Sequence, residues 1–220
     1  MVPIVQGLTA ERVRANLDMV RERIAATGRD PETVEILAAI KYLAPEALAA
    51  LAEGGIRTVG ENRAQELDRK RSAPGAAAFT WDFIGQLQSR KVRDILPHVR
   101  YIHSVASDSV LGQLQRHGDA GTRVLVEVNV AGEEGKGGVA PGDLPGFLER
   151  CPVTVVGLMT MPPLAADPES NRRHFAALRE LAGAHRLPEL SMGTSQDFAV
   201  AVAEGATIVR LGTILYAGAP

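Results

Sequence analysis

The sequence predicts an α/β fold: a single-domain (β/α)8 barrel of the TIM-barrel type with an N-terminal helix. Eight short runs of aliphatic and β-branched residues alternate with amphipathic stretches along the 220 residues, which indicates βα units around a parallel sheet. Eight strands in a chain of this length favour a closed barrel over an open, doubly wound sheet. Because no linker or low-complexity tract interrupts the pattern, residues 1–220 are expected to form one domain.

The first element is a predicted helix that begins after Thr9, a residue type that caps helix N-termini. An apolar stripe at helical spacing follows, and Gly28 is suited to end the helix. Little chain remains after the last strand to form an outer helix. We therefore expect the N-terminal helix to cover the barrel at that point.

The strands and helices alternate in order along the rest of the chain. The candidate strands are residues 34–40, 58–61, 81–84, 101–105, 124–130, 153–158, 190–192 and 208–211. The helical stretches between them are residues 45–52, 63–71, 89–96, 109–117, 141–150, 169–182 and 196–203. The glycine-rich segment at residues 131–143 is expected to be a long loop after the fifth strand, either a mobile lid or a surface turn.

Composition and charge exclude several functional classes. With 24 basic and 26 acidic residues, the chain lacks the basic excess of a nucleic-acid-binding protein. The basic run Arg69-Lys70-Arg71 is expected to form a solvated helix face. The single cysteine, Cys151, permits no intrachain disulfide, and no apolar stretch approaches the ~20 residues of a membrane span. With no signal-peptide pattern at its start, we expect a cytoplasmic protein without nucleic-acid or membrane partners.

Lys41 is the first candidate functional residue, because it ends a strand that is predicted to be buried and has no carboxylate beside it. In a (β/α)8 barrel, catalytic groups lie at the carboxyl ends of the strands. Burial lowers the pKa of a lysine, and a neutral amine is what Schiff-base formation with an aldehyde requires. Spacing alone leaves open whether the side chain simply extends into solvent.

Two segments near the last strands predict an anion site. The segment Ser191 to Ser195 combines a glycine turn, hydroxyls and a helix start, and the segment Arg210 to Thr213 adds an arginine, a glycine and another hydroxyl. Barrels of this kind often bind phosphate after strands seven and eight. The alternative is that Ser195 only caps a helix and Gly212 only packs a tight turn.

An amine at strand one and a phosphate site at strands seven and eight together indicate a ligand that carries an aldehyde and a phosphate. Pyridoxal 5′-phosphate meets that description. Arg210 would then face the pyridine nitrogen.

The five histidines form no close pair or metal-binding pattern, so no metal site is expected, and His103 is expected to pack in the core.

The chain resembles the pyridoxal phosphate homeostasis proteins of the YggS/PROSC type, which are alanine racemase-like barrels of fold type III. The resemblance spans nearly the whole chain and rests on the blocks LAAIKY, VGENRAQE, DFIGQLQSRK, GLMTM, SMGTSQDFAVAVAEGATIVRLGT and LYAG, in family order. It implies one cofactor-binding barrel that takes part in intracellular homeostasis of the cofactor by storing or delivering it. It assigns no robust turnover, and hence no catalytic residue.

The resemblance also implies roles for individual residues. Lys41 would hold the cofactor as a Schiff base, Arg210 would contact the pyridine nitrogen, and Asn62 and Met192 would line the ring. The phosphate would be held by the remaining matching positions, namely Ser195, Gly212 and Thr213 with help from Gly193 and Thr194. Apo forms of pyridoxal phosphate-dependent enzymes are the implied partners, and we expect a monomer.

This chain departs from the family pattern around the lysine. Ile40, Tyr42 and Leu43 stand where a small polar residue, a threonine and a second lysine are usual, so a role carried by that second lysine does not transfer. Asp82 and Gln86 stand where histidines are common. Glu61 is either a partner of Asn62 or an exposed strand end.

A racemase-like enzyme dependent on pyridoxal phosphate is the alternative function. Such an enzyme needs a second acid/base, usually a tyrosine from an additional β-domain, and we expect that domain to be absent because few residues follow strand eight. None of Tyr42, Tyr101 and Tyr216 suits the role; Tyr42 is expected on the opposite side of the strand from Lys41. A barrel enzyme acting on a phosphosugar through Lys41 is a third possibility.

Overall fold

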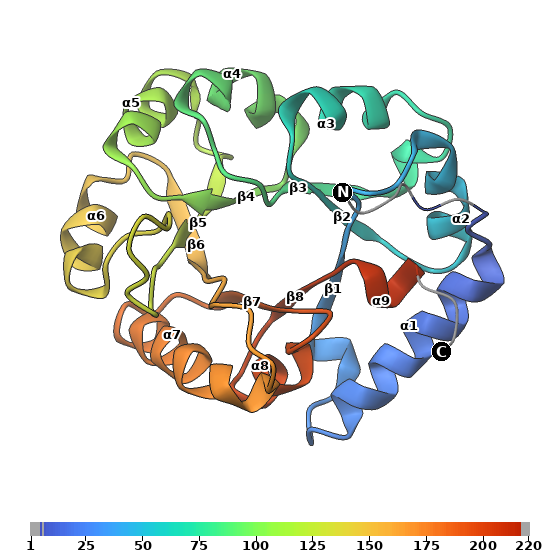
Figure 1. Ribbon diagram of the computed structural model, residues 1–220. Helices are drawn as coiled ribbons and strands as arrows, with labels where there is room; N and C mark the ends of the chain where they lie inside the picture. The colour runs from blue at the N-terminus through green and yellow to red at the C-terminus, as the bar shows by residue number, and fades with distance from the viewer. Residues whose placement is uncertain (1–4, 6, 217–220) are drawn as a thin grey trace.

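Eight parallel strands close into a barrel in the order in which they occur along the chain (Figure 1). The structure is a computed structural model that describes residues 5 and 7–216. Its strands are β1 (Glu35–Ala39), β2 (Thr58–Glu61), β3 (Thr80–Phe83), β4 (Tyr101–Val105), β5 (Arg123–Glu127), β6 (Thr154–Met159), β7 (Glu189–Thr194) and β8 (Ile208–Leu211). Because β1 pairs with both β2 and β8, the sheet has no free edge, and the predicted (β/α)8 barrel is confirmed.

The helices form an outer ring around the strands (Figure 1). They are α1 (Ala10–Ala25), α2 (Leu48–Glu53), α3 (Ala64–Arg71), α4 (Val92–Ile95), α5 (Asp108–His117), α6 (Leu144–Arg150), α7 (Arg172–Ala184), α8 (Phe198–Ala203) and α9 (Thr213–Tyr216). Short 3-10 turns accompany them: η1 (Pro31–Thr33), η2 (Pro45–Ala47), η3 (Ala76–Ala78), η4 (Ser89–Lys91), η5 (Leu96–His98), η6 (Pro141–Asp143) and η7 (Pro168–Asn171). None of the described helices is long and apolar enough to cross a membrane.

Helix α1 covers the barrel beside its last strand, as expected. The side chain of Thr9 caps the helix by accepting a hydrogen bond from the backbone N–H of Arg12 at 3.3 Å. The apolar stripe of α1 is buried and packs against α2, α8 and α9 (Figure 1). At the end of α2, a Cβ on Gly54 would lie 2.5 Å from Val13, so a glycine there lets the two helices approach closely.

Three strands end earlier than the sequence predicted: β1 and β3 by one residue and β5 by three. In β1 and β5 the carbonyls at the strand end bond outside the sheet. Beyond β1, the carbonyl of Ile40 accepts from the N–H of Leu43 and from the ammonium of Lys70. At the end of β5, the carbonyl of Glu127 accepts from the N–H of Val139, on the returning loop. At β1 and β5 the rim of the barrel mouth therefore begins one and three residues earlier than expected.

Candidate functional site

A cavity of about 580 Å³ opens at the carboxyl ends of the strands. Seven of the nine residues that the sequence singled out line it: Lys41, Asn62, Thr194, Ser195, Arg210, Gly212 and Thr213. They come from both ends of the chain, after β1, β2, β7 and β8, and the closed sheet brings them to one mouth. The other lining residues include Tyr42, Ser104, Glu127, Lys136 and Met159.

Met192 and Gly193 do not line this cavity. Successive residues of a strand point to opposite faces. Ser191 on β7 bonds to side chains inside the barrel, and Met192 is buried in the outer core with no exposed surface. Gly193 has a φ of +91°, and a Cβ there would lie 2.7 Å from the Cβ of Ala201 on α8. Both residues thus shape β7 against its helix.

Lys41 lies in the turn after β1 and is exposed, so of the two possibilities that the spacing left open, the structure shows the side chain at the surface. Its Nζ atom lies 4.8 Å from the ring centroid of Tyr42. Tyr42 also lines the cavity, contrary to the sequence expectation, because strand alternation stops at Ala39 and no longer separates the two side chains. The amine therefore reaches the mouth from its rim.

Ser195 forms the centre of a small polar cradle. Its Oγ atom accepts hydrogen bonds from the backbone N–H groups of Gly212 at 3.1 Å and Ile214 at 3.4 Å. A Cβ on Gly212 would meet no atom closer than 3.6 Å, and the residue has no left-handed φ. Neither the backbone nor the packing of the protein requires a glycine at position 212, so its effect is to leave open space beside these donors.

Thr194 uses its polar groups within its own loop. Its backbone N–H and its hydroxyl both donate to Oδ1 of Asp197, at 2.7 and 3.0 Å. The other oxygen of this buried carboxylate accepts from the side-chain amide of Asn171 at 3.0 Å. The Thr194 donors thus fix the loop shape, and sequence reasoning gave no sign that Asp197 holds them.

Arg210 is a buried cation that faces the mouth. Its Nη1 donates to the hydroxyl of Ser191 at 2.7 Å and its Nη2 to the carbonyl of Thr160 at 2.9 Å. Burial lowers the pKa of Arg210 to about 10, and the nearby Glu127 and Asp197 act in the opposite direction. Arg210 thus stays charged at neutral pH, yet within the described part of the chain no carboxylate forms an ion pair with it.

Glu127 is a site residue that sequence reasoning missed. It is the last residue of β5 and lines the mouth, whereas the predicted strand continued to residue 130. Burial raises the pKa of Glu127 above its ordinary value, while Arg210 and Lys136 pull it down. Asn129 instead secures the glycine-rich loop, because its side chain exchanges two hydrogen bonds with the backbone of Glu133.

A buried ion pair lies behind the rim. Nζ of Lys70 lies 2.6 Å from Oε2 of Glu61, and the two side chains are 1% and 0% exposed. The predicted solvated face is therefore wrong for Lys70. Lys70 also donates to the carbonyl of Ile40 at 2.7 Å, and Oε1 of Glu61 accepts from the backbone N–H of Asn62 at 2.7 Å. The pair thus ties together the residues that precede Lys41 and carry Asn62.

Asn62 has a polar atom with nothing to bind inside the protein. Its Oδ1 atom is buried and has no hydrogen-bond partner among the described residues. An unsatisfied buried polar atom costs free energy, roughly 1–3 kcal/mol. Since the side chain lines the mouth, a ligand group is the natural partner for it.

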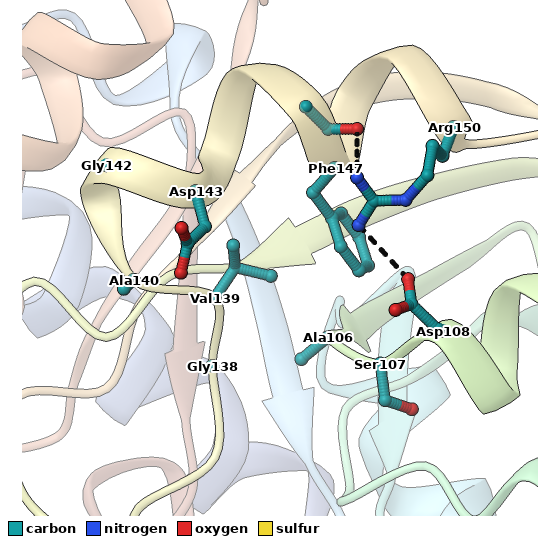
Figure 2. A pocket seen from close by; sticks show the side chains of 11 residues that line it. Ala106, Ser107, Asp108, Gly138, Val139, Ala140, Gly142, Asp143, Phe147 and Arg150 are labelled. Carbon is teal, nitrogen blue, oxygen red and sulfur yellow. Dashed lines mark hydrogen bonds and ion pairs between the residues drawn. The ribbon is translucent and has the colours of Figure 1, made fainter.

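A second hollow, of about 540 Å³, lies outside the mouth beside α5 and α6 (Figure 2). Arg150 reaches across it to Oδ1 of Asp108 at 3.1 Å and to the carbonyl of Gly146 at 2.8 Å. No residue that the sequence singled out as a site lines this hollow. The barrel mouth is therefore the candidate site.

Comparisons with known proteins match the whole described fold. A model of the family "Alanine racemase, N-terminal domain" matches residues 8–220. A protein of Aquifex aeolicus (strain VF5) named pyridoxal phosphate homeostasis protein is 39% identical over 219 residues, which cover 94% of this chain and 96% of that protein.

Two solved structures are also similar to this chain over most of its length. PipY of Synechococcus elongatus PCC7942 with PLP bound is similar at a TM-score of 0.73 and 32% identity, covering 90% of this chain and 99% of PipY. Alanine racemase of Corynebacterium glutamicum is similar at a TM-score of 0.74, covering 100% of this chain and 64% of the racemase. At 17% identity, the second likeness shows a shared fold alone.

Proposed function

The chain belongs to the alanine racemase N-terminal domain family, together with the pyridoxal phosphate homeostasis proteins. On that premise, we propose that it binds pyridoxal 5′-phosphate in the barrel mouth and takes part in intracellular homeostasis of this cofactor. One observation carries the proposal. The Lys41 amine and the Ser195 cradle open into a single cavity, where one ligand can reach both. When bound, the cofactor supplies an aldehyde that a lysine amine can capture as a Schiff base, and an anionic phosphate.

The residues present fit this cofactor. The open space above Gly212 gives a phosphate room to meet the donors around Ser195, and Thr213 adds a hydroxyl at the same rim. The unpaired charge of Arg210 suits contact with the pyridine nitrogen, and the free oxygen of Asn62 can accept from a ring substituent. Lys41 would bind the aldehyde carbon. Thr194, Met192 and Gly193 would support the pocket from behind.

We favour a carrier that stores or delivers the cofactor without robust catalysis. Transfer to apo forms of pyridoxal phosphate-dependent enzymes would be its role, and the chain would act as a cytoplasmic monomer. A racemase-like activity is the alternative, and the observation that favours it is the presence of Tyr42 and Glu127 in the same cavity. Against it, Tyr42 lies against Lys41 on one rim and not across the cavity from it.

An absorbance spectrum of the purified protein with added pyridoxal phosphate tests the proposal. We expect a visible band that stays with the protein after unbound cofactor is removed. Borohydride should abolish the band and leave the cofactor covalently attached, because it reduces an imine with a protein amine to a stable secondary amine. Lys41→Ala should lack the band, and Lys91→Ala, in the turn η4 and outside the cavity, should keep it.

Two results would contradict this function. A band that survives in Lys41→Ala would show that another amine holds the cofactor. Racemisation of amino acids at about 1 per second or faster, with saturating cofactor, would replace the carrier by an enzyme.

A further inference from the structure

A line of buried polar side chains crosses the barrel interior beneath the mouth. Oγ of Ser191 on β7 lies 2.8 Å from Nδ1 of His103 on β4, and Nε2 of that ring lies 3.2 Å from Oδ2 of Asp82 on β3. All three side chains have no exposed surface or nearly none. We call Ser191, His103 and Asp82 the buried relay.

Each end of the buried relay is attached to an arginine. At the mouth, Arg210 donates to the Ser191 hydroxyl at 2.7 Å. At the other end, Arg100 donates to both oxygens of Asp82, at 3.1 and 2.6 Å, and to Glu35 at 3.0 Å. Because Arg100 neutralises the Asp82 carboxylate, the relay is a hydrogen-bonded chain of side chains that adds no uncompensated charge to the core.

The contacts fix the direction of every hydrogen bond in the relay. Burial alone would raise the pKa of Asp82, but hydrogen bonds from His103 and Arg100 hold it below its ordinary value, so the carboxylate only accepts. Nε2 of His103 therefore carries the proton. Burial lowers the pKa of His103, so the ring is neutral and its Nδ1 accepts from the Ser191 hydroxyl. A lone pair of Ser191 is then left to accept from Arg210.

The three residue types are those of a hydrolase triad, but their burial excludes that chemistry. A nucleophilic hydroxyl must meet a substrate carbonyl. Ser191 has no exposed surface, does not line the mouth, and already accepts from Arg210. The buried relay can reach a ligand only through the guanidinium of Arg210, which does line the mouth.

We propose that Ser191, His103 and Asp82 are positioning residues that hold Arg210 in the orientation in which it meets the ring nitrogen of the bound ligand. This rests on the proposed function for the identity of the ligand, but not for the geometry of the relay. Asp82 sets the state of His103, because its carboxylate accepts from Nε2 of that ring.

Asp82→Asn gives the sharpest test, because an amide cannot accept at both of its ends. The Oδ1 position receives the backbone N–H of Tyr101 and Nε of Arg100, which have no other acceptor among the described residues. At the Oδ2 position Nη2 of Arg100 keeps Glu35 as an acceptor and His103 can change tautomer, so the amide oxygen should lie at the Oδ1 position. The amide NH2 then faces Nε2 of His103 and should force the ring proton onto Nδ1. That leaves the Ser191 hydroxyl without its acceptor and weakens the hold on Arg210.

Nitrogen NMR of the ligand-free protein measures both effects. The wild type should show His103 protonated at Nε2, and slowly exchanging guanidinium N–H signals from Arg210. Asp82→Asn should move the ring proton to Nδ1, and Ser191→Ala should abolish the slow exchange at Arg210. Thr207→Val is the matched control, because it removes a hydroxyl that bonds Glu189 and the Leu190 N–H at the far end of β7.

The cofactor complex gives a second readout. Ser191→Ala should shift the absorption maximum of bound pyridoxal phosphate and weaken its binding about tenfold, and Thr207→Val should do neither. Wild-type spectrum and affinity in folded Ser191→Ala, or unchanged Arg210 signals, would overturn the proposal. If the wild type shows no cofactor band, the proposed function fails, while the NMR measurements still decide whether the relay holds Arg210.

Discussion

Gly212 in the mouth and Gly193 behind it are glycines for opposite reasons. Gly193 has a left-handed φ and no room for a Cβ, whereas Gly212 has neither constraint. Gly193 thus allows the backbone conformation and the close packing of β7 on α8. Gly212 leaves space beside Ser195, which is where the proposed phosphate would lie.

Gly212→Ala should separate binding from folding. Its methyl group would make only ordinary contacts with Ala39, so the free energy of unfolding should change by less than about 0.5 kcal/mol. Binding of pyridoxal phosphate should weaken about tenfold or more, because the methyl group fills the space beside the N–H donors. Urea denaturation and a spectroscopic titration measure the two quantities.

Gly193→Ala is the companion variant. It should destabilise the fold by roughly 1–3 kcal/mol, because a Cβ at this φ is strained and meets Ala201 and Phe198. Equal affinity in Gly212→Ala and the wild type would place the phosphate elsewhere.

The sequence identified residues that line the mouth but not those that hold them in place. Lys41, Ser195 and Arg210 were found because short segments at strand ends carry a recognisable pattern. Glu61 and Lys70 were not paired in advance, because their contact depends on how α3 packs over β2. Lys70 in a run of three basic residues gave no local sign that it is buried.

At the scale of elements, the buried Glu61–Lys70 pair joins β1, β2 and α3. Lys70→Met should destabilise the fold by about 3–5 kcal/mol, because it leaves the Glu61 charge buried and unpaired. The adjacent Arg69 is exposed, so Arg69→Ala should change the unfolding free energy by less than about 0.5 kcal/mol. Urea denaturation checks both.

The double variant Glu61→Gln/Lys70→Met is the internal control for this prediction. It removes both charges and should recover part of the loss. If its loss of unfolding free energy equals the sum of the losses in Glu61→Gln and Lys70→Met alone, the contact in the structure carries no coupling energy.

The end of a strand was predictable only where its apolar run and its hydrogen bonds to the neighbouring strands stop at the same residue. The bounds of β2, β4 and β8 match the sequence prediction, since hydrogen bonding and the apolar run stop together there. For β1 and β5, the apolar run continues past the last ladder bond. A side chain or a returning loop takes the next carbonyl, and such distant partners leave no local pattern.

At the scale of the whole molecule, the buried relay makes stability depend on pH. The folded pKa of His103 lies below its unfolded value because of burial, with Asp82 acting to raise it and Arg210 and Arg100 to lower it. The unfolded chain therefore binds a proton first as pH falls through about 6.5, and stability is lost from there downward. The lowered pKa of Asp82 keeps its own contribution intact until stronger acid.

Urea unfolding at pH 7.5 and 5.5, followed by the fluorescence of the single tryptophan, Trp81, measures this effect. Wild-type stability should fall by up to about 1.4 kcal/mol per pH unit below the unfolded histidine pKa. His103→Gln should lose most of that slope, with the remainder from His174, whose pKa is also lowered by burial, while His117→Gln, at an exposed helix end, should keep it. Parallel slopes in all three proteins would assign the acid sensitivity to other groups.

The packing of α1 against α8 and α9 also determines how late in synthesis the protein can finish folding. During translation, α1 and α2 leave the ribosome long before α8 and α9 exist, so the part of the apolar stripe that packs against α8 and α9 stays uncovered on the nascent chain while seven strands are made. Closure of the barrel is therefore a late, long-range event. Through that interval the stripe is a natural binding surface for a chaperone.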